Sequence, residues 1–181
     1  MSREFTLPLF CIERQEPADW VPDCGFLGAK ATAEQVKKAI AEMHTAPQWA
    51  FFPEMRIGTG YGKDVQQSID AWAMNLYPAD GLIRVSYEVK VSRGDFLAEL
   101  KLPQKRKHAL LVSNRFYFAA PKGLIKPEEL PAEAGLIEVL DNGRAHTRIH
   151  APWRDAMPVS SKFLASVCRR VFDEEKRKVK E

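Results

Sequence analysis

The stretch LIRVSYEVKV, residues 82–91, alternates between apolar and polar side chains from Ile83 onward. A period of two is typical of a β-strand that is buried on one face. Glu88 and Lys90 are two residues apart, so both project to the same side of the sheet. An acid and a lysine side by side on a strand are costly to bury unless they pair, bind a metal or line a water-filled cleft. The stretch therefore predicts a sheet and a candidate site on it.

A preceding apolar run, SIDAWAMNLY at residues 68–77, predicts a second strand. It contains Asp70, a residue type that strands disfavour, and a residue that breaks its local rule is a candidate for function. If the two strands pair as a hairpin around PADG, residues 78–81, Asp70 and Glu88 become neighbours across the ladder. Aromatic residues in strands are usually core, but Trp72 shares the Asp70 face and is therefore also a candidate for lining the same cleft.

Phosphodiester hydrolysis would use these three charged residue types together. Two converging carboxylates, Asp70 and Glu88, form a hard-oxygen site suited to Mg²⁺. Such a metal would polarise the scissile phosphate and lower the pKa of a bound water, while Lys90 would steady the attacking water or the developing charge.

The remaining chain predicts helices and strands that complete a mixed α/β (α+β) sheet with helices packed on it. Thr32 is an N-cap candidate for the first helix, Pro103 interrupts the second, and Asn142-Gly143 is a hairpin turn signal. The expected elements are a helix at 32–44, a strand at 49–57, a helix that begins at Ser92, a strand-like run at 110–121, a hairpin at 135–150 and a closing helix from about Ser160.

The length of 181 residues and the 45% hydrophobic composition predict one domain with terminal extensions. We expect an irregular lead-in at residues 1–30, an α/β core at 31–158 and a C-terminal helix with a charged tail at 159–181. The lead-in is interrupted too often by proline and glycine for a long regular element.

Charge and cysteine content exclude several classes of protein. The net charge of +3 is too small to argue for nucleic acid by itself. The three cysteines are not closely spaced, so neither a disulfide framework nor a zinc cluster is expected, and a reducing, cytoplasmic compartment fits best. No stretch predicts a signal peptide or a membrane-spanning segment.

SIDAW, followed after a turn by YEVKVS, resembles the Asp...Glu-x-Lys signature of the PD-(D/E)XK nuclease superfamily, which has the restriction-endonuclease-like fold. The wider run YEVKVSRGDFLAELK, together with RFYFAAPKGLI, resembles the MmcB-like DNA repair proteins of that superfamily. The resemblance covers about residues 32–140. It departs at Ile69, where the superfamily name has proline.

This resemblance implies a restriction-endonuclease-like core of helix, three strands, helix and strand, here followed by a C-terminal hairpin and helix. It implies metal coordination by Asp70 and Glu88, a catalytic role for Lys90, and Glu54 as an additional acidic metal ligand. The expected cofactor is Mg²⁺ or Mn²⁺. The expected activity is that of a DNA endonuclease in repair, recombination or phage-type DNA processing.

Several alternatives stay open at this stage. The same fold could be a catalytically silent module that binds DNA or a repair partner, or a structural protein in which Glu88 and Lys90 merely pair. A homodimer is a further alternative. Asp95 and Glu99 are expected to support their helix through charge pairs. A basic cluster after the strand could track a DNA backbone or form a solvated helix face; its members are Arg93, Lys101, Lys105, Arg106 and Lys107.

Overall fold

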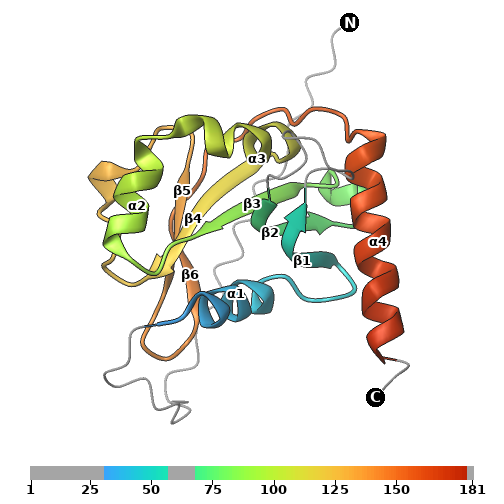
Figure 1. Ribbon diagram of the computed structural model, residues 1–181, viewed down its shortest axis with the longest axis horizontal. Helices are drawn as coiled ribbons and strands as arrows, with labels where there is room; N and C mark the ends of the chain where they lie inside the picture. The colour runs from blue at the N-terminus through green and yellow to red at the C-terminus, as the bar shows by residue number, and fades with distance from the viewer. Residues whose placement is uncertain (1–30, 57–67, 179–181) are drawn as a thin grey trace, which may run out of the picture.

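A mixed six-stranded sheet with helices on both faces forms the body of the protein (Figure 1). The computed structural model describes residues 31–56 and 68–178. The strands are β1 (Trp49–Arg56), β2 (Ser68–Asn75), β3 (Arg84–Val89), β4 (Arg115–Pro121), β5 (Gly135–Val139) and β6 (Ala145–Ile149). The helices are α1 (Ala33–Glu42), α2 (Arg93–Leu100), α3 (Lys107–Val112) and α4 (Ser161–Lys178), with 3₁₀ turns η2 (Pro78–Asp80), η3 (Pro103–Arg106) and η4 (Pro127–Glu129).

The strands lie in sequence order across the sheet. β1, β2 and β3 form an antiparallel meander, β3, β4 and β5 are parallel, and β6 pairs antiparallel with β5. The crossover from β3 to β4 carries α2, η3 and α3, because parallel neighbours cannot be joined by a tight turn. The predicted mixed α/β sheet is therefore confirmed, together with the C-terminal hairpin and helix.

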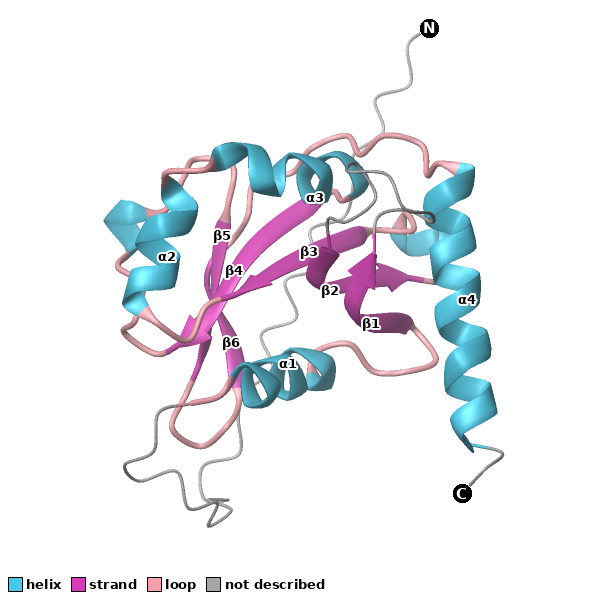
Figure 2. Ribbon diagram, in the orientation of Figure 1, coloured by secondary structure: helices cyan, strands magenta, loops and turns pink. Residues whose placement is uncertain are grey.

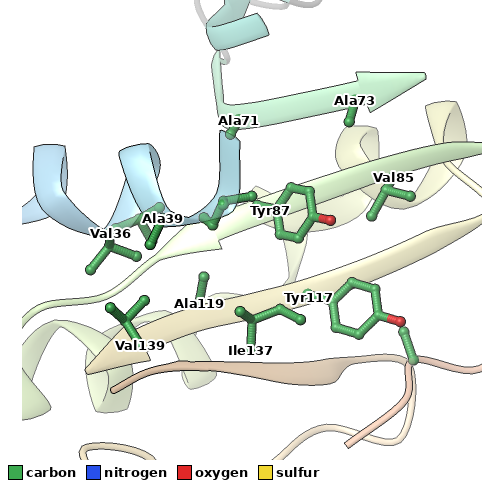
Figure 3. Packing of buried hydrophobic residues seen from close by; sticks show 13 residues of the cluster. Val36, Ala39, Ala71, Ala73, Val85, Tyr87, Tyr117, Ala119, Ile137 and Val139 are labelled. Carbon is green, nitrogen blue, oxygen red and sulfur yellow. The ribbon is translucent and has the colours of Figure 1, made fainter. Parts of the chain in front are cut away.

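The helices divide between the two faces of the sheet (Figure 2). α1 packs on one face, where Figure 3 shows Val36 and Ala39 beside Ala119 and Val139 of the sheet. The aromatic side chains of α2 and α4 pack on the other face, against an apolar cluster contributed by β1, β2 and β4. Each face thus has its own hydrophobic core, and β3 lies between them.

Both faces of β3 are covered by helices. The face that carries Arg84, Ser86 and Glu88 is therefore not open to solvent along its whole length. Val85 and Tyr87 point into the α1 core, as the alternation predicts. On the opposite side Ser86 is fully buried under α3, and its hydroxyl donates a hydrogen bond to the Ala109 carbonyl oxygen at 3.3 Å. At the two ends of the strand, Arg84 and Glu88 on this side are only half-buried.

Of the two alternatives for Trp72, the structure shows the core position and not the cleft lining. Its ring packs edge-on against Phe163 of α4, with centroids 5.2 Å apart and an interplanar angle of 76°. Both side chains are buried. An aromatic residue in a strand buries more apolar area against a covering helix than in a polar cleft, and here that helix is α4.

The predicted ends of several elements are confirmed by local hydrogen bonds. Thr32 and Gln35 form a reciprocal capping box at α1. Gly143 has a φ of +77° in the turn between β5 and β6, a conformation that glycine adopts without strain. The strand expected from residue 110 begins later, at Arg115, because residues 110–112 extend α3. The Ser113 hydroxyl donates to the Ala109 carbonyl oxygen at 2.6 Å where this helix ends.

The expected lead-in at residues 1–30 and the last residues of the charged tail lie outside the described residues. In the part of the chain that the structure describes, no helix combines the length and apolarity that crossing a membrane requires.

We expect Phe163→Ala to destabilise the protein by about 3–5 kcal/mol, because it leaves a cavity beside Trp72. Its neighbour Leu164 is exposed, so Leu164→Ala should change stability by no more than about 0.5 kcal/mol. Urea unfolding of both variants measures the difference. Equal stabilities would mean that α4 does not unfold with the sheet.

Candidate active site

The pairing of β2 with β3 brings Asp70 and Glu88 together. Ala71 pairs with Tyr87 and Trp72 with Ser86, so the register continued by one residue sets Asp70 opposite Glu88. The Asp70 Oδ2 atom accepts a hydrogen bond from the Val89 backbone N–H at 2.8 Å. The predicted hairpin around residues 78–81 is thereby confirmed, and one carboxylate oxygen of Asp70 is fixed in position.

An irregularity in β2 directs Asp70 toward its neighbouring strand. In a regular strand Ile69 and Ala71 would share a face, yet they belong to opposite hydrophobic cores. The change of face falls at Asp70, at the level of Glu54 on β1, which has a φ of +53°. Asp70 therefore points sideways to the Val89 amide of β3 rather than into either core. Such local irregularities of strand pairing often re-aim a side chain at a site.

Lys90 lies between two carboxylates. Its ammonium nitrogen Nζ donates to Glu88 Oε1 at 2.7 Å and lies 3.7 Å from Glu99 Oε2. The side chains of Lys90, Glu88 and Glu99 are 11%, 22% and 5% exposed, respectively. The two partly desolvated carboxylates are tolerated because both pair with the Lys90 ammonium.

Glu99 is a site residue that the sequence analysis missed. It was expected to support α2 on its surface, but the structure buries it against Lys90. A signal was present in the spacing, since Glu99 follows Phe96 by three residues and so shares the helix face that Phe96 directs into the core. An acid on the apolar face of a helix that follows Glu-x-Lys is the pattern that could have found it.

Burial and neighbouring charges together raise the pKa values of both Glu88 and Lys90. Burial raises the pKa of Glu88, the charge of Asp70 raises it further, and Lys90 offsets only part of this. For Lys90, burial lowers the pKa, but the charges of Glu88, Glu99 and Asp70 outweigh burial and raise it overall. Lys90 is therefore an ammonium at neutral pH and supplies a fixed positive charge rather than a base.

A cavity of about 350 Å³ opens over this cluster. Asp70, Lys90 and Glu99 form part of its wall, together with Lys37 of α1 and Lys105 of η3. Glu88 does not form part of this wall and reaches it through its bond to Lys90. The other wall residues are Ala33, Val89, Val91, Asp95 and Ala98. The cavity thus lies between α1 on one side and the α2–η3 segment on the other.

The residues present fit a hard divalent cation. Asp70 and Glu88 supply carboxylate oxygens from adjacent strands, and the mutual repulsion that raises the Glu88 pKa is what a cation would relieve. Among residues 31–56 and 68–178, no group of three His, Cys, Asp or Glu side chains is arranged to hold a metal. A two-carboxylate site is nevertheless ordinary for Mg²⁺, which keeps several waters and binds substrate phosphate oxygens.

Glu54 is not brought into a common cluster with Asp70 and Glu88. Its carboxylate instead accepts a hydrogen bond from Lys37 Nζ at 2.8 Å. The structure therefore places the predicted third acid beside the cavity, at one of its cationic wall residues, rather than with the other two acids.

The five cations of the predicted basic cluster do not form one surface. Arg93 binds Glu129 and the Leu124 carbonyl oxygen, and Arg106 is buried with Glu133 at 2.8 Å. Lys101 is exposed and is not part of the cavity wall. Lys107 lines a different cavity, with Pro103 and Arg154. Lys105 alone of the five faces the candidate site, and its ammonium has no ion-pair partner among the described residues.

A solved structure is similar to this chain: the SPO1766 protein of unknown function from Silicibacter pomeroyi. The two share 22% sequence identity with a TM-score of 0.57, over 81% of this chain and 92% of the other. At this identity the likeness shows the fold alone. No protein-family model and no curated protein matches the chain.

We expect Glu88→Gln to stabilise the protein at neutral pH. Because the folded state raises the pKa of Glu88, ionising this carboxyl costs folding free energy as the pH rises through the raised value. Below the ordinary glutamate pKa of about 4.3 the carboxyl is neutral in both states, so the gain should vanish there. Lys90 keeps Glu99 as its partner in the variant.

Thermal unfolding of the parent and of Glu88→Gln, at acidic and neutral pH, measures this difference. A gain of 1 kcal/mol raises the Tm of a chain of this size by roughly 2–4 °C. A variant that is less stable than the parent at neutral pH would show that the ion pair with Lys90 outweighs the desolvation of Glu88.

Proposed function

We propose that this protein is a Mg²⁺- or Mn²⁺-dependent DNA endonuclease with an active site formed by Asp70, Glu88 and Lys90. The observation that carries the proposal is the set of three charges at the end of one strand pair. Asp70 lies opposite Glu88, and Glu88 is bonded to Lys90 beside an open cavity. Structural ion pairs need no such cavity, whereas hydrolysis of a phosphodiester does.

Asp70 and Glu88 are the residues that would hold the metal. The Val89 amide fixes one oxygen of Asp70. Because a carboxylate is planar and rigid, this bond also restricts the position of the other oxygen. A bound divalent cation supplies Lewis acidity toward a phosphate oxygen and a lowered pKa for a coordinated water. Holding both carboxylates in adjacent strands spares the site the entropy of ordering them when substrate arrives.

Lys90 stabilises negative charge at the scissile phosphate. It remains an ammonium because Glu88, Glu99 and Asp70 raise its pKa, so it can donate hydrogen bonds to phosphate oxygens but not accept a proton. Glu99 is a positioning residue, because it is buried behind Lys90 and limits where the ammonium can move. Glu88 is shared between Lys90 and the metal in this scheme.

DNA is the proposed substrate for two reasons. Lys37 and Lys105 stand in the cavity wall on α1 and on η3, on either side of the carboxylates, where a phosphodiester backbone needs cations. The chain also resembles the MmcB-like DNA repair proteins in the motifs that surround Glu88 and Lys90. Repair, recombination or phage-type DNA processing is the proposed setting.

A silent DNA-binding module is the second candidate. The observation that favours it is that Lys90 already has two carboxylate partners, so part of the buried negative charge is offset without a metal. Such a protein would use the same cavity to hold DNA and would not cut it.

We expect the parent protein to nick supercoiled plasmid, branched DNA or single strands with Mg²⁺ or Mn²⁺ and not with EDTA. Asp70→Asn and Lys90→Met should each reduce cutting on the order of 10²-fold or more. Asparagine keeps an oxygen that accepts from the Val89 N–H, so the fold should survive. Asp141→Asn, at an exposed carboxylate outside the cavity wall, is the matched control and should cut like the parent.

If both site variants cut as well as the parent, the site is assigned wrongly. If the parent binds DNA with every metal and cuts none, the silent module is the better description.

We expect Lys105→Ala to weaken DNA binding more than Lys107→Ala. Lys105 faces the candidate site, whereas Lys107 lines another cavity, so the two substitutions remove the same charge from different places. Each lost phosphate contact should lower the slope of log K against log salt by about 1. Fluorescence anisotropy over a salt series measures both quantities, and identical losses would show only a general effect of charge.

A further inference from the structure

A second ion-pair system lies in the wall of the same cavity. Lys37, on α1, donates to Glu54 Oε1 at 2.8 Å and lies 3.3 Å from Glu34 Oε1. The Lys37 side chain is only 12% exposed, whereas Glu54 is 64% exposed. The cation is therefore held in the wall, and its main partner is the group that solvent reaches.

Glu54 is presented to Lys37 by an unusual backbone conformation. Its φ of +53° is uncommon for a residue with a Cβ, and it falls between Pro53 and Met55, which pair with Ala71 and Ile69 of β2. This position is level with Asp70. The Lys37–Glu54 pair thus lies next to the carboxylate that would hold the metal.

Glu54 has a second cation nearby. The hydrogen bond and charge of Lys37 lower the pKa of Glu54, and the charge of Arg170 on α4 lowers it further. If another anion took the place of Glu54 at Lys37, the Glu54 carboxylate would still face a positive charge. Because the Glu54 side chain is 64% exposed, water solvates its carboxylate when another anion displaces it from Lys37.

We propose that Lys37 binds a backbone phosphate next to the scissile one, and that Glu54 is an internal anion that occupies Lys37 until DNA displaces it. This inference rests on the proposed function, since it assigns Lys37 to the substrate of that site. A lysine ammonium is a compact charge with three donors, which suits a phosphate as well as a carboxylate. A clamp that merely joins α1 to β1 would need neither the cavity nor an exposed partner.

The test compares DNA binding by four forms of the protein in EDTA, with a short fluorescein-labelled duplex as the probe. Lys37→Met should weaken binding on the order of tenfold and lower the salt slope by about 1, as loss of one charge-assisted phosphate contact does. Lys38→Met is the matched control, because Lys38 is the adjacent, exposed lysine of α1 outside the cavity wall. It should cost less than threefold, roughly the effect of a distant surface charge.

Glu54→Gln should act in the opposite direction and tighten binding severalfold, because it removes the nearer carboxylate partner of Lys37, leaving Glu34 at 3.3 Å, without changing the shape of the side chain. This opposite sign separates an internal competitor from a structural clamp. It also keeps the test decisive if Lys37→Met fails to fold, which circular dichroism would show.

Equal losses in Lys37→Met and Lys38→Met would overturn the proposal, as would Glu54→Gln binding no more tightly than the parent. A parent that does not bind the duplex would overturn it too. Because the assay contains no metal, a protein that binds as expected but never cuts would overturn the endonuclease proposal and leave the phosphate site in place. A protein that cuts, with binding unchanged in Lys37→Met, would overturn only the phosphate site.

Discussion

The hydrogen bond from the Val89 amide to the Asp70 carboxylate determines where the candidate site can form. It joins β2 to β3 at the point where β2 changes the faces of its side chains, so a residue that would have entered a core instead points along the sheet. The bond also gives one Asp70 oxygen a fixed partner, which makes a carboxylate tolerable at a partly buried position. Glu88 is then opposite Asp70 through the strand register rather than through any contact of its own.

Charge compensation is the second constraint, and it favours function over stability. Burial and the charge of Asp70 raise the pKa of Glu88, so ionising this carboxyl costs folding free energy. Lys90 offsets part of that cost and is itself held by Glu99. A core made of apolar residues at these positions would be at least as stable, so the arrangement is better explained by what it does than by what it stabilises.

The sheet was predictable from sequence because its strands carry local signals, the alternation around Tyr87 and the turn at Gly143. The start of α1 carries one as well, the cap at Thr32, and all three depend on nearby residues alone. Asp70 and Glu88 were predictable as a pair because the register of a hairpin follows from the position of its turn, here residues 78–81. Glu99, Trp72 and Arg106 could not be placed in this way. The environment of each is set by an element distant in sequence or by the inward face of a helix. Neither the alternation of side chains along a strand nor a count of charges reveals which surface another helix will cover.

The balance of charges in the cavity explains why a net charge of +3 says so little about nucleic acid. The cavity wall has three lysines and three acids, so it is close to neutral before Glu88 is counted and carries about one negative charge after it. Without a metal the wall has no net positive charge, so a phosphodiester is attracted only by individual lysines such as Lys37 and Lys105. With a divalent cation held by Asp70 and Glu88, the same wall becomes positive by about one charge, and Lys105 and Lys37 then add to an attractive field instead of cancelling a repulsive one. Under the proposed function, a bound metal therefore strengthens DNA binding and bound DNA strengthens metal binding, and the global charge of the chain has no part in selecting either.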